Sequence, residues 1–313
     1  MSNTDHVIFS IKSSLKLFGL QNFLNDLIKL FNSDKLPKVI LLSGRKGIGK
    51  STLVNHFLTY VFDKKNYDLE NRIINNDTIY YKQYINMIFP NIIYLSGSNF
   101  KNIKIENIRD LRKLILTKSL FNNKRFIIFD DVEMFNNNCL NALLKILEEP
   151  TDKNHFILIN NNSKKLLETI LSRSIEFKIF LTTKERLDII ESLIKRDNIE
   201  TQINYKQSNI TPGNFLRFNK IILENKINLN EDFIYTLDTA LSIYKKDKDM
   251  YKLNMILFLI DCHFQKIKEF EEYNIEKIIS DKNFILNNIN NFITFNINQK
   301  SLINAINNKL NNE

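Results

Sequence analysis

The hydrophobic positions in the first half of the chain form short runs separated by longer amphipathic stretches. The runs are rich in β-branched and aromatic residues: VILLS (39–43), NIIYL (91–95), RFIIFD (125–130), HFILIN (155–160) and the shorter IEFKI (175–179). Continuous apolar runs of this length are typical of strands whose two faces are both covered. We therefore predict an α/β domain with a parallel sheet.

Between the runs, apolar residues recur at the spacing of an amphipathic helix. One set lies between the first and second runs and comprises Leu53, Val54, Phe57, Leu58 and Val61. Another follows the third run and comprises Leu140, Leu143, Leu144 and Leu147. We expect Pro150 to end the second of these helices, because proline lacks the N–H group that a helix interior needs.

The pattern changes near residue 181, after which we find helical periodicity and no convincing strand. TTKERLDIIESLI opens with a capping box, Thr182 with Glu185, which predicts a helix start. A later helix is expected in TPGNFL, with Thr211 as its N-cap and Pro212 as its first residue. These boundaries predict three domains: an α/β core (1–180), a small helical domain (181–225) and a C-terminal helical domain (226–313).

Composition limits the kinds of protein that this chain can be. With 43% hydrophobic and 25% charged residues, its 313 residues are typical of a globular protein. No apolar run approaches the roughly 20 residues that span a bilayer, and we find no export signal, so we expect a cytoplasmic protein. The net charge of +9 permits an acidic partner such as nucleic acid.

The two cysteines, Cys139 and Cys262, lie far apart in apolar helical patterns. Two separated thiols cannot form a thiolate zinc site, and we expect both to be buried and inert. His263 adjoins Cys262, but adjacent side chains on a helix point in different directions, so we do not expect a shared metal.

The stretch SGRKGIGKST fits the phosphate-loop motif G-x-x-x-x-G-K-[ST], directly after the first run and before a helical pattern. Backbone N–H groups of such a loop and the start of the helix surround phosphates. Lys50 would reach the β- and γ-phosphates, and the Ser51 hydroxyl would bind magnesium. The candidate nucleotide-binding residues of the loop are Gly44, Gly47, Gly49, Lys50, Ser51 and Thr52.

Two aspartates end the third run. Asp130 is placed to hold magnesium through water, beside the phosphate loop. Hydrolysis also needs a carboxylate that orients the attacking water, and Asp131 is the candidate. Asp131 is one methylene shorter than the usual glutamate, and a displacement of about 1 Å can lower a rate roughly 100-fold.

Arg173 follows the fourth run, in TILSRS. An arginine there does not readily face its own phosphate loop, and we expect it to act on a neighbouring subunit as an arginine finger. Such a group contributes roughly 10³ to 10⁵ in rate where measured. The alternative is a surface arginine in a turn.

Taken together, these motifs resemble those of clamp-loader subunits of the AAA+ class, most of all the delta-prime subunits of bacterial DNA polymerase III. The similar segments are FGLQNFLNDLI, KLPKVILLSGRKGIGKST, IENIRDLRKLI, RFIIFDDVEMFNNNCLNALLKILEEP, TILSRS and TPGNFL, within about residues 18–217. NALLKILEEP followed by SR and a small residue is the most specific combination. The resemblance implies an AAA+ core, a helical lid and a helical C-terminal collar.

The resemblance also assigns roles to residues. Asp130 matches the magnesium carboxylate, Asn161 (or its neighbour Asn160) the polar sensor, and Arg173 the trans-acting arginine of a Ser-Arg-Cys motif. Motor subunits have Asp-Glu where this chain has Asp130-Asp131, and a lid arginine where it has Gly213; Arg217 lies one turn later. The four-cysteine module of many relatives is replaced by residues 63–90, so no zinc is expected.

The implied function is that of a stator, which donates Arg173 to a motor subunit while the complex places a sliding clamp on primed DNA. Its own loop would bind ATP and Mg²⁺ but turn ATP over slowly or not at all. The implied partners are gamma/tau motor subunits, a delta subunit, the sliding clamp and primer-template DNA. The alternatives are a gamma/tau-like motor subunit with true ATPase activity and an unrelated AAA+ ATPase such as a helicase loader.

The family that these motifs resemble also implies where DNA and partners bind, on basic and apolar helix faces. Arg109, Arg112 and Lys113 form one stripe at helical spacing, and Lys145 lies on the NALLKILEE helix. A solvated helix face is the alternative interpretation of the stripe. The C-terminal collar of the family is expected to include Leu253, Ile256, Leu257, Leu259 and Ile260.

Overall fold

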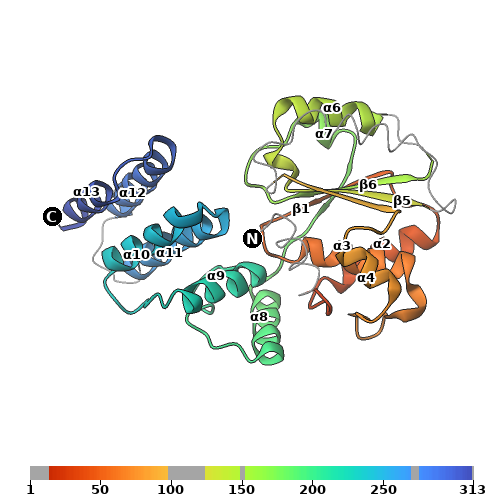
Figure 1. Ribbon diagram of the computed structural model, residues 1–313, viewed down its shortest axis with the longest axis horizontal. Coiled ribbons are helices and arrows are strands. Elements are labelled where there is room, and N and C mark those ends of the chain that lie inside the picture. The colour runs from red at the N-terminus through yellow and green to blue at the C-terminus, as the bar shows by residue number, and fades with distance from the viewer. Residues whose placement is uncertain (1–13, 98–123, 149–151, 269–274, 312–313) are drawn as a thin grey trace. The chain divides into compact units, whose positions relative to one another are not determined.

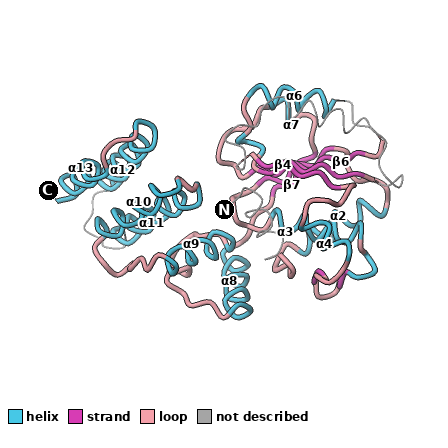
Figure 2. Tube along the Cα trace, viewed as in Figure 1, coloured by secondary structure: helices cyan, strands magenta, loops and turns pink. Residues whose placement is uncertain are grey.

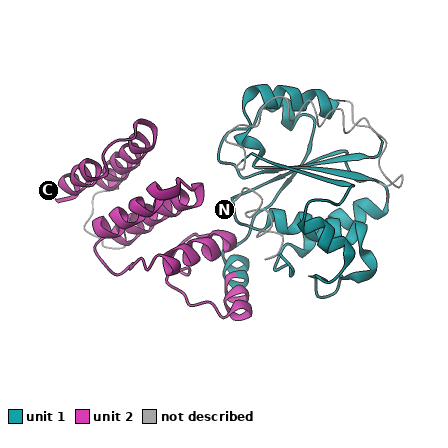
Figure 3. Ribbon diagram, in the orientation of Figure 1, with its two compact units in different colours: residues 1–189 teal, residues 190–313 magenta. Residues whose placement is uncertain are grey.

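The computed structural model describes residues 14–97, 124–148, 152–268 and 275–311. The chain divides into two compact units, residues 1–189 and 190–313 (Figure 3). The predicted boundary at residue 180 lies nine residues before this division. The second predicted boundary, near residue 225, lies inside the second unit, and the three-domain organisation stays a prediction.

The first unit contains a five-stranded sheet in the order β4-β5-β6-β1-β7. All of its strand pairs are parallel. Its strands are β1 (Val39–Ser43), β4 (Ile92–Ser96), β5 (Arg125–Asp130), β6 (Asn154–Asn160) and β7 (Ile175–Lys178). The α/β prediction is confirmed, and every predicted strand is present with its ends shifted by one residue at most.

Helices cover both faces of this sheet (Figures 1 and 2). On one face lie α2 (Gln21–Asn32), α3 (Lys50–Phe62) and α4 (Ile79–Ile85), and on the other lie α6 (Asn137–Glu148) and α7 (Glu168–Leu171). Side chains alternate along a strand, so Ile40 and Leu42 join the core of the first face and Val39 and Leu41 the core of the second. This double coverage explains why the strands are continuously apolar.

Residues 63–90 form small elements that the hydrophobic pattern did not reveal. The 3-10 helix η1 (Lys64–Asn66) is followed by a hairpin of β2 (Tyr67–Asp68) and β3 (Ile73–Ile74), and then by α4. The hairpin is joined to α3 through buried His56, whose Nδ1 accepts a hydrogen bond from the Tyr67 hydroxyl at 2.9 Å. The stretch thus packs as part of the first unit.

The helices of the C-terminal part are α8 (Thr183–Asp197), α9 (Pro212–Glu224), α10 (Phe233–Asp247), α11 (Met250–Lys268), α12 (Ile275–Phe295) and α13 (Gln299–Asn311). The predicted capping box precedes α8: the Thr182 N–H donates to Glu185 Oε2 at 2.8 Å, and the Glu185 N–H donates to Thr182 Oγ1 at 3.3 Å. As predicted, α9 begins at Pro212, directly after Thr211. One apolar cluster connects residues from α8 to α13.

The two cysteines differ in how deeply they are buried. Cys139 is fully buried, as expected, whereas Cys262 is only partly buried; its burial raises the pKa of the thiol to about 11. The His263 ring stacks on Phe233 with ring centroids 3.8 Å apart.

Pro150 lies outside the described residues, and α6 ends at Glu148. Within the part of the chain that the structure describes, no helix is long and apolar enough to cross a membrane.

Candidate nucleotide site and a separate arginine site

The phosphate loop connects the carboxyl end of β1 to the start of α3. Gly44 lies so close to the segment after β7 that a Cβ atom on it would be 2.3 Å from the carbonyl oxygen of Ile179. Gly49, at the N-cap of α3, has a φ of 102°, which residues with a side chain rarely adopt. The motif glycines are therefore required by the local backbone, and the loop ends at a helix start that favours anions.

Lys50 is held inside the loop. Its side chain is 3% exposed, and its Nζ donates to the carbonyl oxygens of Gly44 at 2.6 Å and Arg45 at 2.9 Å. Burial lowers the pKa of this ammonium to about 8, because the charged form loses water while its partners are neutral carbonyls. A phosphate in the loop would supply the anionic partner that stabilises the charge.

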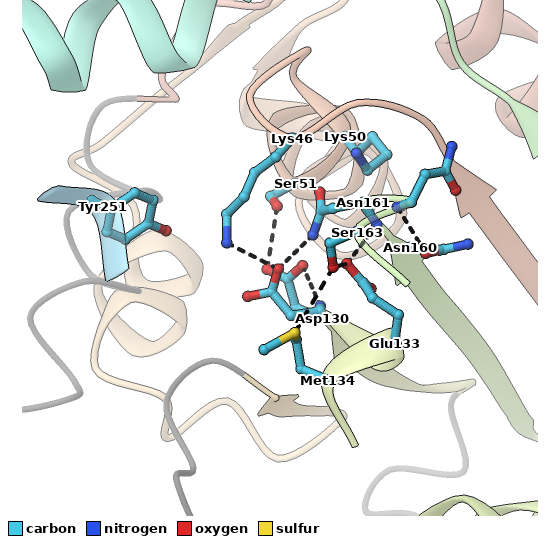
Figure 4. A network of polar contacts seen from close by, with 12 residues as sticks. Lys46, Lys50, Ser51, Asp130, Glu133, Met134, Asn160, Asn161, Ser163 and Tyr251 are labelled. Atoms are coloured by element: carbon cyan, nitrogen blue, oxygen red, sulfur yellow. Dashed lines mark hydrogen bonds and ion pairs between the residues drawn. The ribbon is translucent and has the colours of Figure 1, made fainter. Parts of the chain in front are cut away.

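Ser51 and Asp130 lie together below the loop (Figure 4). The Ser51 hydroxyl is 3.4 Å from Asp130 Oδ2, and the Tyr94 hydroxyl donates to the same carboxylate oxygen. Burial and the nearby Asp131 carboxylate both raise the pKa of Asp130. A hydroxyl and a carboxylate side by side are the oxygen ligands that Mg²⁺ prefers, so these two residues fit the metal of a nucleotide complex.

Two side chains bind the carboxylate of Asp131. It is 4% exposed and accepts hydrogen bonds from Lys46 Nζ at 3.2 Å and from the Asn161 side-chain amide. Lys46 occupies a variable position of the phosphate-loop motif, so the motif gave no indication of this contact. Asp131 itself has a φ of 50°, in the left-handed region. The candidate water-orienting carboxylate is thus fixed in an ion pair.

Asn161, and not Asn160, faces the acidic pair (Figure 4). The Asn160 side chain instead accepts the Asn162 N–H at 2.9 Å. The Asn161 backbone N–H donates to Glu133 Oε1 at 3.1 Å, and the Ser163 hydroxyl donates to the same oxygen at 2.9 Å. Glu133 is 6% exposed and ties the end of β6 to the segment after β5. Sequence reasoning missed Glu133, Tyr94 and Lys46.

Arg173 lies at the amino-terminal ends of the strands, opposite to the phosphate loop at their carboxyl ends. It precedes the amino end of β7, whereas the phosphate loop follows the carboxyl end of β1, and these two strands are parallel neighbours. The five residues of β1 span about 16 Å at roughly 3.3 Å per residue, farther than an arginine side chain reaches. This position agrees with the expectation that Arg173 does not face its own phosphate loop.

The other residues that the sequence analysis named are Thr52, the candidate DNA-binding residues and the lid positions. Thr52 Oγ1 lies 3.3 Å from the Ser14 hydroxyl, and Lys145 is exposed on α6. Arg109, Arg112 and Lys113 lie outside the described residues. Gly213 is the second residue of α9, and the Arg217 guanidinium lies over the Tyr251 ring, 3.8 Å from its centroid.

Within the described ranges, there is no group of three or more His, Cys, Asp or Glu side chains that could hold a metal ion. The absence of zinc stays an expectation, because part of the chain is outside these ranges.

The parallel sheet, the phosphate loop and the Ser51–Asp130 pair define a phosphate-loop protein of the α/β class. Residues 19–182, more than half of the chain, match the family described as DNA polymerase III, delta subunit. The chain belongs to this family as a delta-prime-like subunit, with an α/β core followed by a helical C-terminal region.

Two similar proteins carry different subunit names. A DNA polymerase III subunit delta' from Buchnera aphidicola subsp. Schizaphis graminum is 31% identical over 157 residues, covering 49% of this chain and 45% of that protein. A DNA polymerase III subunit gamma from Buchnera aphidicola subsp. Acyrthosiphon pisum is 25% identical over 199 residues, covering 62% and 53%. The matched part thus spans about half the length of these two relatives.

Among solved structures, a gamma subunit-related protein from Thermotoga maritima is 15% identical with a TM-score of 0.46. The comparison covers 90% of this chain and 96% of that one.

Proposed function

We propose that this chain is the delta-prime-like stator of a clamp loader, and that Arg173 acts in trans on the ATP site of an adjacent motor subunit. The observation that carries the proposal is the position of Arg173 at the sheet edge opposite the chain's own phosphate loop. A guanidinium on that edge is available to a second subunit, where it would stabilise the charge that develops during phosphoryl transfer.

The chain's own phosphate loop would bind ATP with Mg²⁺ and hydrolyse it weakly. The Ser51–Asp130 pair supports metal binding, because the two oxygens are 3.4 Å apart. The ion pair between Lys46 and Asp131 supports weak hydrolysis, because a carboxylate bound to an ammonium is a poorer acceptor for a water proton. Mg²⁺, when bound with nucleotide, would neutralise phosphate charge.

The assembly would contain gamma/tau motor subunits, a delta subunit, the sliding clamp and primer-template DNA. Lys145 on α6 and the basic residues Arg109 and Arg112 would contact the DNA phosphate backbone, which gives affinity without sequence preference. The alternative is a gamma/tau-like motor, and it has support from the relative that is named gamma.

The test is ATP hydrolysis by the complete complex, stimulated by clamp and primer-template DNA. Arg173→Ala in this subunit is expected to lower turnover at least tenfold, and Lys50→Ala to change it less than twofold. The stator proposal fails if Lys50→Ala is the damaging substitution and Arg173→Ala has no effect. In that case this chain is a motor subunit.

A further inference from the structure

Arg173 is fixed by acceptors from two helices. Its Nη2 lies 2.8 Å from Glu148 Oε1, at the end of α6. Its Nη1 donates to the Thr169 carbonyl in α7 at 2.9 Å and to the Ser172 hydroxyl at 3.4 Å. Because a guanidinium is planar, acceptors on both terminal nitrogens define the orientation of the whole group.

The bound guanidinium still has hydrogen-bonding capacity. Arginine has five N–H donors, and the contacts above use both of those on Nη1 and one on Nη2. The second N–H of Nη2 and the N–H of Nε lie outside these contacts. The Arg173 side chain is 34% exposed and that of Glu148 is 48% exposed. An ion pair with this exposure contributes little to stability, so its main effect is on the orientation of Arg173.

Arg173 and Glu148 line one cavity of about 630 Å³ at the amino-terminal edge of the sheet. Pro37, Lys38 and Val39 form the part of its wall that precedes and begins β1. Beside the arginine, Leu171 is 38% and Ile175 is 56% exposed. The charged side chains of the lining are Lys38, Arg173 and Glu148, so one positive charge is in excess. An excess positive charge beside exposed apolar side chains suits a surface that receives an anionic group carried by another protein.

We infer that Glu148 is a positioning residue that holds the Arg173 guanidinium at this cavity, oriented for the nucleotide phosphates of the adjacent subunit. The inference rests on the proposed function. Fixing the side chain before assembly lowers the conformational entropy lost when it meets the phosphate, and it keeps the group near its productive geometry. Glu148 thus acts only through Arg173.

The experiment is a double-mutant cycle in the complete complex, with clamp- and DNA-stimulated ATP hydrolysis as the measurement. Glu148→Ala is expected to lower kcat roughly fivefold with KM for ATP nearly unchanged, and Glu148→Gln to lower it less, because the amide oxygen still accepts a hydrogen bond. In the Arg173→Ala background, Glu148→Ala is expected to have no further effect. Glu168→Gln on α7 is the matched control, because Glu168 pairs with Lys165.

The outcomes separate the two proposals. If Arg173→Ala has no effect on turnover, the proposed function fails. If Arg173→Ala is damaging but Glu148→Ala raises the rate, leaves it unchanged, or adds its full effect in the Arg173→Ala background, only the role of Glu148 is overturned. Urea unfolding of each variant is the folding control. A variant that unfolds with the m-value of the wild type is folded, so a change in its turnover does not result from loss of folding.

Discussion

At the residue scale, Asp131 is held by both its side-chain partners and its backbone conformation. Its carboxylate is buried and bonded to Lys46 and Asn161, in a backbone conformation with a φ of 50°. Aspartate and asparagine tolerate this left-handed conformation better than longer residues do. Aspartate at this position is thus suited to its backbone and to its partners.

Asp131→Glu is expected to lower the free energy of unfolding by about 1 kcal/mol, because glutamate fits the left-handed conformation poorly. ATP hydrolysis by the isolated chain is expected to stay within twofold of wild type, since the longer carboxylate still faces Lys46. Urea unfolding and a steady-state ATPase assay measure the two effects. Asp131→Asn is the control that keeps the shape of the side chain. A tenfold rise in turnover would contradict this expectation, because it would show that the length of the side chain, and not its pairing with Lys46, limits hydrolysis.

His56 makes the stability of the first unit depend on pH. Burial lowers its pKa to about 4, and its Nε2 donates to the Ser14 carbonyl at 2.8 Å while Nδ1 accepts from Tyr67. In the unfolded chain the imidazole has a pKa near 6.5, so between pH 6.5 and 4 the unfolded state binds more protons. Stability is therefore lost as the pH falls through this window.

His56→Gln removes the titration and offers an amide that can bond to both partners. Between pH 7.5 and pH 5 the wild type is expected to lose about 2 kcal/mol more unfolding free energy than this variant. Urea titrations at the two pH values measure the difference. Equal losses in both proteins would show that His56 is not the responsible group.

At the scale of elements, α8 begins at a local signal that the sequence made visible. Thr182 and Glu185 satisfy each other's backbone N–H groups at 2.8 Å and 3.3 Å. Thr182→Ala is expected to lower the free energy of unfolding by about 1 kcal/mol. Thr183→Ala, at the neighbouring exposed threonine, is the control and should change it by less than about 0.5 kcal/mol. Similar losses in both variants would argue against the cap.

The strands could be predicted because coverage on both faces leaves a continuous apolar run, as in β1 and β6. The hairpin of β2 and β3 could not, because two-residue strands are too short to show a period. In the candidate site, the phosphate loop is a local motif and was visible in the sequence. The side-chain contacts at the two sites were not visible, because they join residues far apart in the sequence. Lys46 and Asp131 are 85 residues apart, and Glu148 and Arg173 are 25 residues apart.

At the scale of the whole molecule, two sites lie at opposite ends of the parallel strands of the sheet. One end carries the loop, Ser51 and Asp130, and the other carries Arg173 and its cavity. In the function proposed above, the subunit receives a nucleotide at the first of these ends and acts on another subunit's nucleotide from the second. Whether the chain is a stator or a motor depends on which end does the chemistry.

The most direct measurement is single-turnover hydrolysis of ATP by the complete complex at saturating ATP, with wild type, Arg173→Ala and Arg173→Lys in this subunit. We expect hydrolysis at one class of ATP site to slow at least 100-fold with Arg173→Ala while ATP affinity is unchanged. Lysine is expected to restore little of the rate, because it lacks the planar fork of arginine. Undiminished hydrolysis at every site in the Arg173→Ala complex would contradict the account.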